Sequence, residues 1–143
     1  MKSCFSYAEK HGTLSAGHPR RIVWTGGKPK RGSQMANKER LLAFFEAENE
    51  RDWATYRTFL SPDVVWVLHS DQTRTIAGVG AYLAAIAAAY RDNNNTFVCE
   101  ALYQSGDGNR IVAVLQNDLG ERSCDVFEFS GGLIAKEHEF ILA

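Results

Sequence analysis

The chain has 143 residues, of which 45% are hydrophobic and 23% are charged, a balance typical of one globular domain. Its longest weakly polar run, residues 81–90, is about half of the roughly 20 apolar residues that a membrane span needs. No segment has a signal-peptide pattern, and Cys4, Cys99 and Cys124 form neither a paired set nor a Cys-x-x-Cys motif. We therefore expect a cytoplasmic protein without membrane segment, disulfide or zinc knuckle.

The first 34 residues differ in charge from the rest of the chain. They carry a net charge of +6, whereas residues 35–143 carry −7. Their Gly, Ser and Lys content and weak apolar periodicity predict a flexible basic tail, followed by one domain over residues 35–143. Two alternatives stay open: a tail that binds an acidic partner, or a start-site artefact with Met35 as the true start. Nucleic-acid binding is not expected, because the acidic domain has no basic surface interleaved with aromatic residues.

Helical and strand patterns follow one another along the domain. Residues 37–51 have the periodicity of an amphipathic helix, with Asn37 as a candidate N-cap. Asp52 is expected to cap a short second helix over 53–60. Strands are predicted at 63–69 and 73–78, and an Ala-rich third helix at 80–91.

The remainder reads as a strand meander. Strands are predicted at 96–104, 110–117, 122–129 and 133–142, and the turns between them are rich in Gly, Asp and Asn. Helices that come first and antiparallel strands that follow indicate an α+β fold, with the helices covering one face of a curved sheet.

Several motifs resemble a known family. The stretches "FFEAENERDWATYRTFLSPDVVW", "IAGVGAYLAAI" and "VFEFSGGLIAKEHEF" are similar, in this order, to the SnoaL-like branch of the nuclear transport factor 2-like (NTF2-like) superfamily. The resemblance covers roughly residues 37–142. It implies a conical α+β barrel with an apolar pocket between the helices and the concave sheet face, usually in a homodimer.

The same resemblance leaves the function open, because this fold hosts isomerases, cyclases, epoxide hydrolases and proteins without chemistry. We expect a protein that binds a small apolar or amphipathic metabolite, with acid–base isomerase, cyclase or hydratase chemistry. The alternative is a non-catalytic module for ligand binding or dimerisation. No cofactor is expected, and no metal, because His69 and His138 lack a ligand-spacing signature.

Asp125 and His138 are the predicted catalytic pair. If Gly131-Gly132 forms a two-residue type I′ turn, alternation along the last hairpin places Asp125 directly opposite His138. An acid–base pair would then face the pocket, although a buried Asp–His pair can also be purely structural. Glu137 and Glu139 are expected on the opposite face. Lys136 then falls on the apolar face, so it must snorkel to the rim or the register is wrong.

The remaining pocket residues come from strand alternation and from the resemblance. Trp66 and Leu68 share one face of their strand, and His69 is expected at the rim; Tyr82 and Tyr90 are either core or pocket floor. In ketosteroid isomerase, a tyrosine and a carboxylate base would match Phe44 and Leu68, so its chemistry is not expected here. The predicted lining is Trp66, Leu68, His69, Phe44, Tyr56, Val114, Gln116 and Phe127.

Overall fold

A computed structural model describes residues 35–142, so the predicted basic tail lies outside the described residues. Within that range no helix has the length and apolar character to cross a bilayer. The elements in chain order are α2 (Asn37–Glu50), α3 (Trp53–Arg57), β1 (Leu60–His69), β2 (Thr73–Ala77), α4 (Val79–Ala89), β3 (Phe97–Gln104), β4 (Arg110–Asn117), β5 (Arg122–Ser130) and β6 (Leu133–Leu142).

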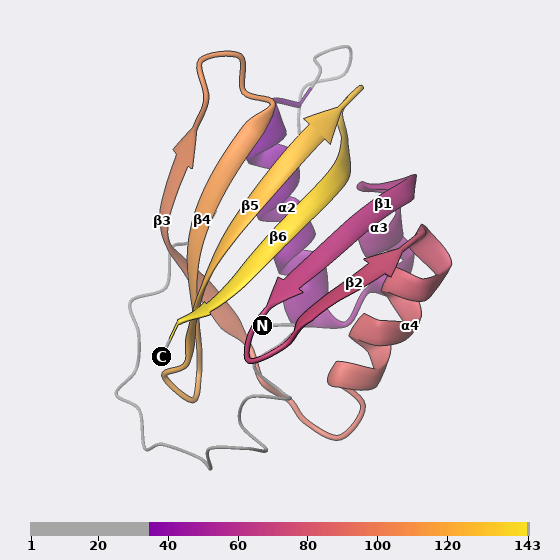
Figure 1. Cartoon of the computed structure of the whole chain (residues 1–143), viewed down its shortest axis with the longest axis vertical. Helices are drawn as coiled ribbons and strands as arrows, with labels where there is room; N and C mark the ends of the chain where they lie inside the picture. The colour runs from indigo at the N-terminus through magenta and orange to yellow at the C-terminus, as the bar shows by residue number, and fades with distance from the viewer. Residues whose placement is uncertain (1–34, 143) are drawn as a thin grey trace.

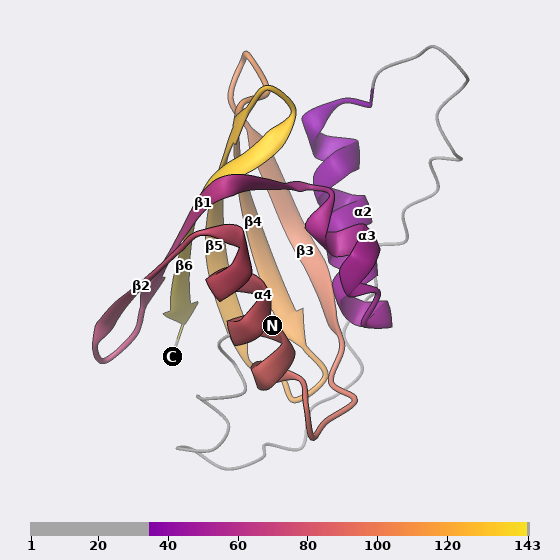
Figure 2. The ribbon, with the colours of Figure 1, turned by 90° about the vertical axis from the view of Figure 1, so that its right-hand side faces the viewer.

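The six strands form one sheet in the order β2-β1-β6-β5-β4-β3 (Figure 1). Strands β3 to β6 make the predicted antiparallel meander, whereas β1 runs parallel to β6. The sheet is therefore mixed and does not close into the expected barrel. Among the described residues, all three helices lie on one face of the sheet (Figure 2). The α+β class is confirmed, and the sheet has an inner face toward the helices and an outer face.

The two predicted helix caps have different outcomes. Asp52 caps α3, because its side chain accepts a hydrogen bond from the backbone N–H of Thr55. The prediction for Asn37 is wrong, since α2 begins after Ala36 without a side-chain cap. Asn37 instead donates from its amide to the carbonyl of Gly108, 2.9 Å away, and so ties α2 to the turn between β3 and β4.

Aromatic side chains fill the space between the helices and the inner face. The rings of Phe44 and Tyr56 stack with centroids 4.0 Å apart, and Phe127 meets Phe44 edge-on at 6.3 Å. Trp66 packs against Tyr82 with centroids 5.2 Å apart. Such pairs each contribute about 0.5–1.5 kcal/mol beyond their buried area. This core fixes the helices that carry the polar groups of the site.

A bulge in the last hairpin changes the predicted register. Gly131 and Gly132 have positive φ angles of 58° and 79°, as a type I′ turn requires. The expected register holds only as far as Phe129 opposite Ile134; then Ala135 is skipped and Glu128 pairs with Lys136. One extra residue exchanges the faces of the following strand. Because of this bulge, Lys136 points outward beside Glu128 and is not buried.

The turn between β4 and β5 also differs from the prediction. The N–H of Asn117 donates to the carbonyl of Glu121, so the loop has three residues, and Gly120 adopts a positive φ of 85°. The predicted lining by Val114 and Gln116 requires a two-residue loop at Leu119-Gly120, which would place Val114 opposite Asp125. Ala113 therefore lies opposite Asp125, and Val114 lies opposite Cys124. The prediction that Val114 and Gln116 lie on the inner face is wrong. Both lie on the outer face, because they alternate along β4 with the buried residues of the inner face.

Candidate functional site

Two rows of side chains cross the inner face of β1, β6 and β5. Trp66, Glu137 and Phe127 form one row, and Leu68, Glu139 and Asp125 form the next. All six are at most 6% exposed. The expectation that Glu137 and Glu139 lie on the outer face, solvated or at a dimer interface, is therefore wrong, and the reason is the bulge at Ala135.

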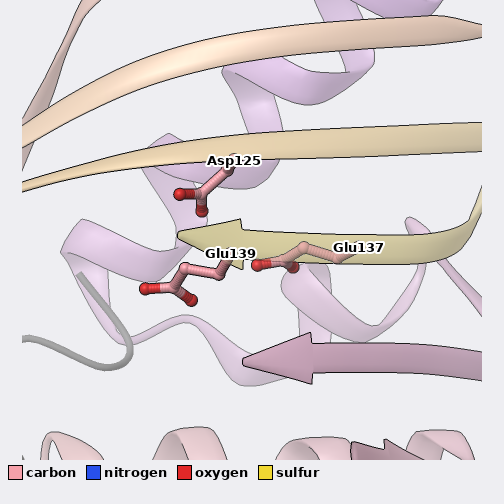
Figure 3. Close-up of side chains that lie close together, drawn as sticks. All are labelled: Asp125, Glu137 and Glu139. Carbon is pink, nitrogen blue, oxygen red and sulfur yellow. The ribbon is translucent and has the colours of Figure 1, made fainter. Parts of the chain in front are cut away.

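Asp125, Glu137 and Glu139 bring three carboxyl groups together in the interior (Figure 3). One oxygen from each lies within 4.8 Å of the others. Asp125 also accepts a hydrogen bond from the hydroxyl of Ser123 at 2.6 Å. Three negative charges at this spacing repel strongly, so the cluster has to share protons or hold a cation. The oxygen ligands would suit a hard cation, but shared protons neutralise the cluster equally well, so for this cluster the absence of a metal stays a prediction.

A chain of buried hydroxyl groups links the carboxylates to the helices. The hydroxyl of Tyr82 on α4 donates to Glu137 Oε1 at 2.5 Å, and lies 3.4 Å from the hydroxyl of Tyr56 on α3. Tyr56 donates to Glu48 Oε1 on α2 at 2.8 Å, and Tyr90 donates to Glu48 Oε2 at 2.6 Å. Three helices and one strand are thereby joined in a single polar network inside an aromatic core.

Burial keeps these tyrosines protonated. Desolvation is the largest cause that raises the pKa of Tyr56, Tyr82 and Tyr90 well above the ordinary value, and the neighbouring Glu48 or Glu137 raises it further. Each hydroxyl therefore acts as a hydrogen-bond donor near neutral pH. The hydrogens of Tyr56 and Tyr82 point to Glu48 and to Glu137 respectively, so the two hydroxyls, 3.4 Å apart, meet as oxygens at the centre of the network.

The predicted contact between Asp125 and His138 does not form. Asp125 pairs with Glu139 and faces inward, whereas His138 pairs with Val126 and faces outward. His138 Nδ1 instead lies 3.0 Å from Nε2 of His69, whose ring stacks on Phe140 with centroids 4.4 Å apart. The two residues cannot act as one hydrogen-bonded pair, and the catalytic role of each remains a prediction.

The surroundings of His138 lower the pKa of its imidazole. Desolvation lowers its pKa most, the positive charge of Lys136 and the neighbouring His69 lower it further, and Glu128 opposes the shift. Near neutral pH the imidazole is therefore uncharged. Burial also raises the pKa of the Cys99 thiol to about 11, so this cysteine is not a thiolate nucleophile near neutral pH.

The other predicted pocket residues divide between the two faces. Phe44, Tyr56, Trp66, Leu68 and Phe127 are buried around the carboxylates, whereas His69, Val114 and Gln116 lie on the outer face. An open hollow of about 300 Å³ lies elsewhere, at the turn end of β3 and β4, and none of the predicted residues lines it. The inner carboxylate–tyrosine network is therefore the candidate site.

Glu48 is the site residue that the sequence reasoning missed. It follows Leu41, Phe44 and Phe45 at helical spacing, so the same periodicity that predicts the apolar face of α2 places Glu48 on it. A carboxylate on an apolar helix face is a signal that could have been found. For Glu137 and Glu139, the one signal in the sequence was that alternation put Lys136 on the apolar face. A bulge itself is not visible in strand alternation.

A mixed open sheet, with its helices on one face and a buried carboxylate–tyrosine network beneath them, defines an NTF2-like α+β protein. The family model described as "SnoaL-like domain" matches residues 41–137, so the chain belongs to that family. No protein of curated function matches the chain significantly.

Solved structures share the fold at low sequence identity. Bal32a, from a soil-derived mobile gene cassette, is 21% identical, with a TM-score of 0.67 over 74% of this chain and 88% of its own. Rv0760c from Mycobacterium tuberculosis, solved in complex with estradiol-17beta-hemisuccinate, is 19% identical, with a TM-score of 0.64 over 74% and 91%. A computationally designed 17-OHP binder is 17% identical, with a TM-score of 0.64 over 75% and 91%.

Proposed function

We propose that this protein binds a small apolar or amphipathic metabolite between its helices and the inner sheet face, and that the buried carboxylates carry out proton transfer on it. Trp66, Leu68 and Phe127 supply the apolar walls. Glu137, hydrogen-bonded to Tyr82, supplies the acid–base group, and Glu139 and Asp125 adjust its charge. The reaction class is an isomerisation, cyclisation or hydration, in which Glu137 takes a proton from one atom of the metabolite and returns a proton to another.

The single observation that carries this proposal is the Tyr82–Glu137 hydrogen bond beside two further buried carboxyl groups. A core built only for stability is better served by apolar side chains, because desolvating charges costs more than their pairing returns. Titratable groups with perturbed surroundings gather at functional sites. Two structural neighbours are linked to small-molecule ligands: one was solved in complex with estradiol-17beta-hemisuccinate, and the other is a computationally designed 17-OHP binder.

The test is a ligand panel read by thermal melting and by tryptophan fluorescence, to which the buried Trp66 contributes together with Trp24 and Trp53. The panel contains apolar and amphipathic ring compounds, beginning with estradiol-17beta-hemisuccinate. We expect at least one compound to raise the melting temperature, and Glu137→Gln to abolish its turnover while the fold is retained. Glu128→Gln on the outer face is the matched control and should change neither. No melting shift with any compound at saturating concentration, in a folded protein, would overturn the proposal.

A second candidate, a non-catalytic module, is favoured by the closure of the network. Tyr56, Tyr82, Glu137 and Glu139 are all 0% exposed, so a ligand touches them only after packed side chains move. If turnover is absent and ligand binding is unchanged in Glu137→Gln, the protein binds without chemistry.

We also propose a homodimer that forms through the outer sheet face. Tyr103 is 67% exposed, Phe140 and Leu142 are each 40% exposed, and the row from Tyr103 through Val112 to Val126 is apolar. The six strands lie about 4.8 Å apart. The area of the outer face that they form approaches the roughly 800 Å² that each partner buries in a standard interface. Sedimentation velocity should give twice the chain mass, and the double variant Tyr103→Asp, Leu142→Asp should give one chain mass. A monomeric parent protein at micromolar concentration contradicts this. We include a cytoplasmic location in the proposal, because the two cysteines of the described residues, Cys99 and Cys124, are free thiols, as a reducing compartment favours.

A further inference from the structure

We propose that His69 and His138 form a chelating site for one divalent transition-metal ion, such as Cu²⁺ or Ni²⁺, on the outer face of the sheet. This site is separate from the carboxylate–tyrosine network and does not depend on the proposed function. Its carrying observation is that two imidazole nitrogens from distant parts of the chain, His69 Nε2 and His138 Nδ1, lie 3.0 Å apart.

The distance between the nitrogens fits bidentate coordination. Imidazole nitrogens bind such ions at about 2.0–2.1 Å. Two ligands at a right angle are then about 2.9 Å apart, and two at the tetrahedral angle about 3.4 Å. The observed 3.0 Å is close to the right angle of square-planar and octahedral sites, which Cu²⁺ and Ni²⁺ prefer.

Both ligands are held in place before any ion binds. His69 ends β1 and His138 lies within β6, and these strands are paired in parallel with Val67 beside His138 and Phe140 beside His69. The His69 ring is stacked on Phe140 with an interplanar angle of 6°. Ligands on paired strands with a fixed ring lose little freedom on binding, and this preorganisation favours affinity.

The proton balance is simple. In the ion-free pair one ring nitrogen donates its hydrogen to the other, and the tautomers decide which. An ion needs both facing nitrogens as lone-pair donors. The donor ring therefore moves its hydrogen to its second nitrogen, Nδ1 of His69 or Nε2 of His138, so each ring keeps one N–H. Water fills the remaining coordination positions.

Within a single chain the surroundings leave the pair accessible, so the ion binds the monomer; the homodimer proposed above covers this same face and would compete with the ion. Both histidines are half-buried, and among the described residues no helix covers this face of the sheet (Figure 2). Lys136 lies two residues before His138 on β6, and Glu128, opposite Lys136 on β5, offsets its charge. The pair has no sequence spacing signature, because it is created by the parallel β1–β6 pairing and by the bulge at Ala135.

The experiment titrates the full chain with Cu²⁺ and Ni²⁺, separately, by isothermal calorimetry. His11 and His18 in the tail are first replaced in a His11→Gln, His18→Gln background, which we expect to bind one ion per chain. In that background His69→Gln or His138→Gln should weaken binding at least about tenfold, since even the loss of a second-shell group costs about 10–100-fold. Asn109→Gln, at the far end of the hairpins, is a control that should bind normally.

A second measurement needs no variant at the site. Substoichiometric Ni²⁺ should broaden the imidazole NMR signals of His69 and His138 in the unaltered chain, and EDTA should restore them. Equal affinity in the His69→Gln and His138→Gln variants, or no binding in the tail-substituted background, would overturn the proposal. Broadening confined to His11 and His18 would overturn it as well, even if a variant at the site failed to fold.

Discussion

Glu139 on β6 lies directly opposite Asp125 on β5, and both carboxyl groups are at most 2% exposed. Like charges in directly opposed positions of an antiparallel pair are destabilising. Glu137 completes the cluster from the same face of β6. The fold therefore carries a local electrostatic cost at the candidate site, as functional sites commonly do.

The first prediction is that Glu139→Gln stabilises the protein. The amide keeps the size and hydrogen-bonding capacity of the side chain but removes one of three adjacent acidic groups. We expect the free energy of unfolding to rise by about 0.5–2 kcal/mol, measured by urea denaturation near neutral pH. Glu128→Gln is the control, because Glu128 pairs with exposed Arg110 on the outer face and its loss should cost at most about 1 kcal/mol. A destabilised Glu139→Gln variant would indicate a purely structural cluster.

The second prediction concerns the donor to Glu137. Tyr82→Phe removes the hydroxyl that donates to Glu137 at 2.5 Å and leaves the ring in place. Loss of a buried partner costs about 1–3 kcal/mol, so urea denaturation should show destabilisation in this range. Tyr103→Phe makes the same change on a side chain that is 67% exposed and should have little effect. Equal stability of the two variants would contradict the role assigned to Tyr82.

Much of the fold follows from local sequence patterns, and the failures have one physical origin. The α+β class, the meander, the positive φ angles of Gly131 and Gly132 and the cap at Asp52 are each determined by a few neighbouring residues. The sheet face that a strand residue occupies depends instead on every residue between that residue and the turn. The single bulge at Ala135 was enough to exchange His138 with Glu137 and Glu139.

Local sequence patterns also could not predict the parallel pairing of β1 with β6. Val67 and His138 are neighbours although 71 positions separate them, and no periodicity within either strand specifies that pairing. The environment of Lys136 was the one sequence-level indication of an error, since a lysine among phenylalanines is costly to bury. Glu48 could have been identified, because helical spacing alone places it with Leu41 and Phe44.

The third prediction tests the glycine turn that precedes the bulge. Gly132 has φ of 79°, and a Cβ there would lie 3.1 Å from Cζ of Arg40. Gly132→Ala should therefore destabilise the protein by about 1 kcal/mol or more, because alanine is strained at positive φ. Gly80→Ala in α4 is the matched control, since its Cβ meets nothing within 4 Å and alanine favours the helix. A melting temperature that falls for Gly80→Ala and not for Gly132→Ala would contradict the turn geometry.

The fourth prediction is a pH dependence at the cap of α3, the helix that carries Tyr56 into the network. The side chain and the backbone N–H of Thr55 donate to Asp52 and lower the pKa of its carboxyl below 3.8. A lowered folded-state pKa means that the charged cap stabilises the fold above the unfolded pKa, and that this contribution is lost as the pH falls through the folded pKa. Asp52→Asn keeps a capping side chain without the charge.

The unfolding free energy of the parent protein should therefore exceed that of Asp52→Asn near neutral pH, and the difference should shrink as the pH is lowered from about 6 to about 2. Chemical denaturation at several pH values measures it. Asp63→Asn is a control for general charge effects, because Asp63 lies outside this cap. A difference that grows toward acid pH would require a raised pKa and would contradict the hydrogen bonds from Thr55. If the difference shrinks as expected, the charged carboxylate of Asp52 holds the start of α3 in place. The cap then also positions the Tyr56 hydroxyl, which donates to Glu48.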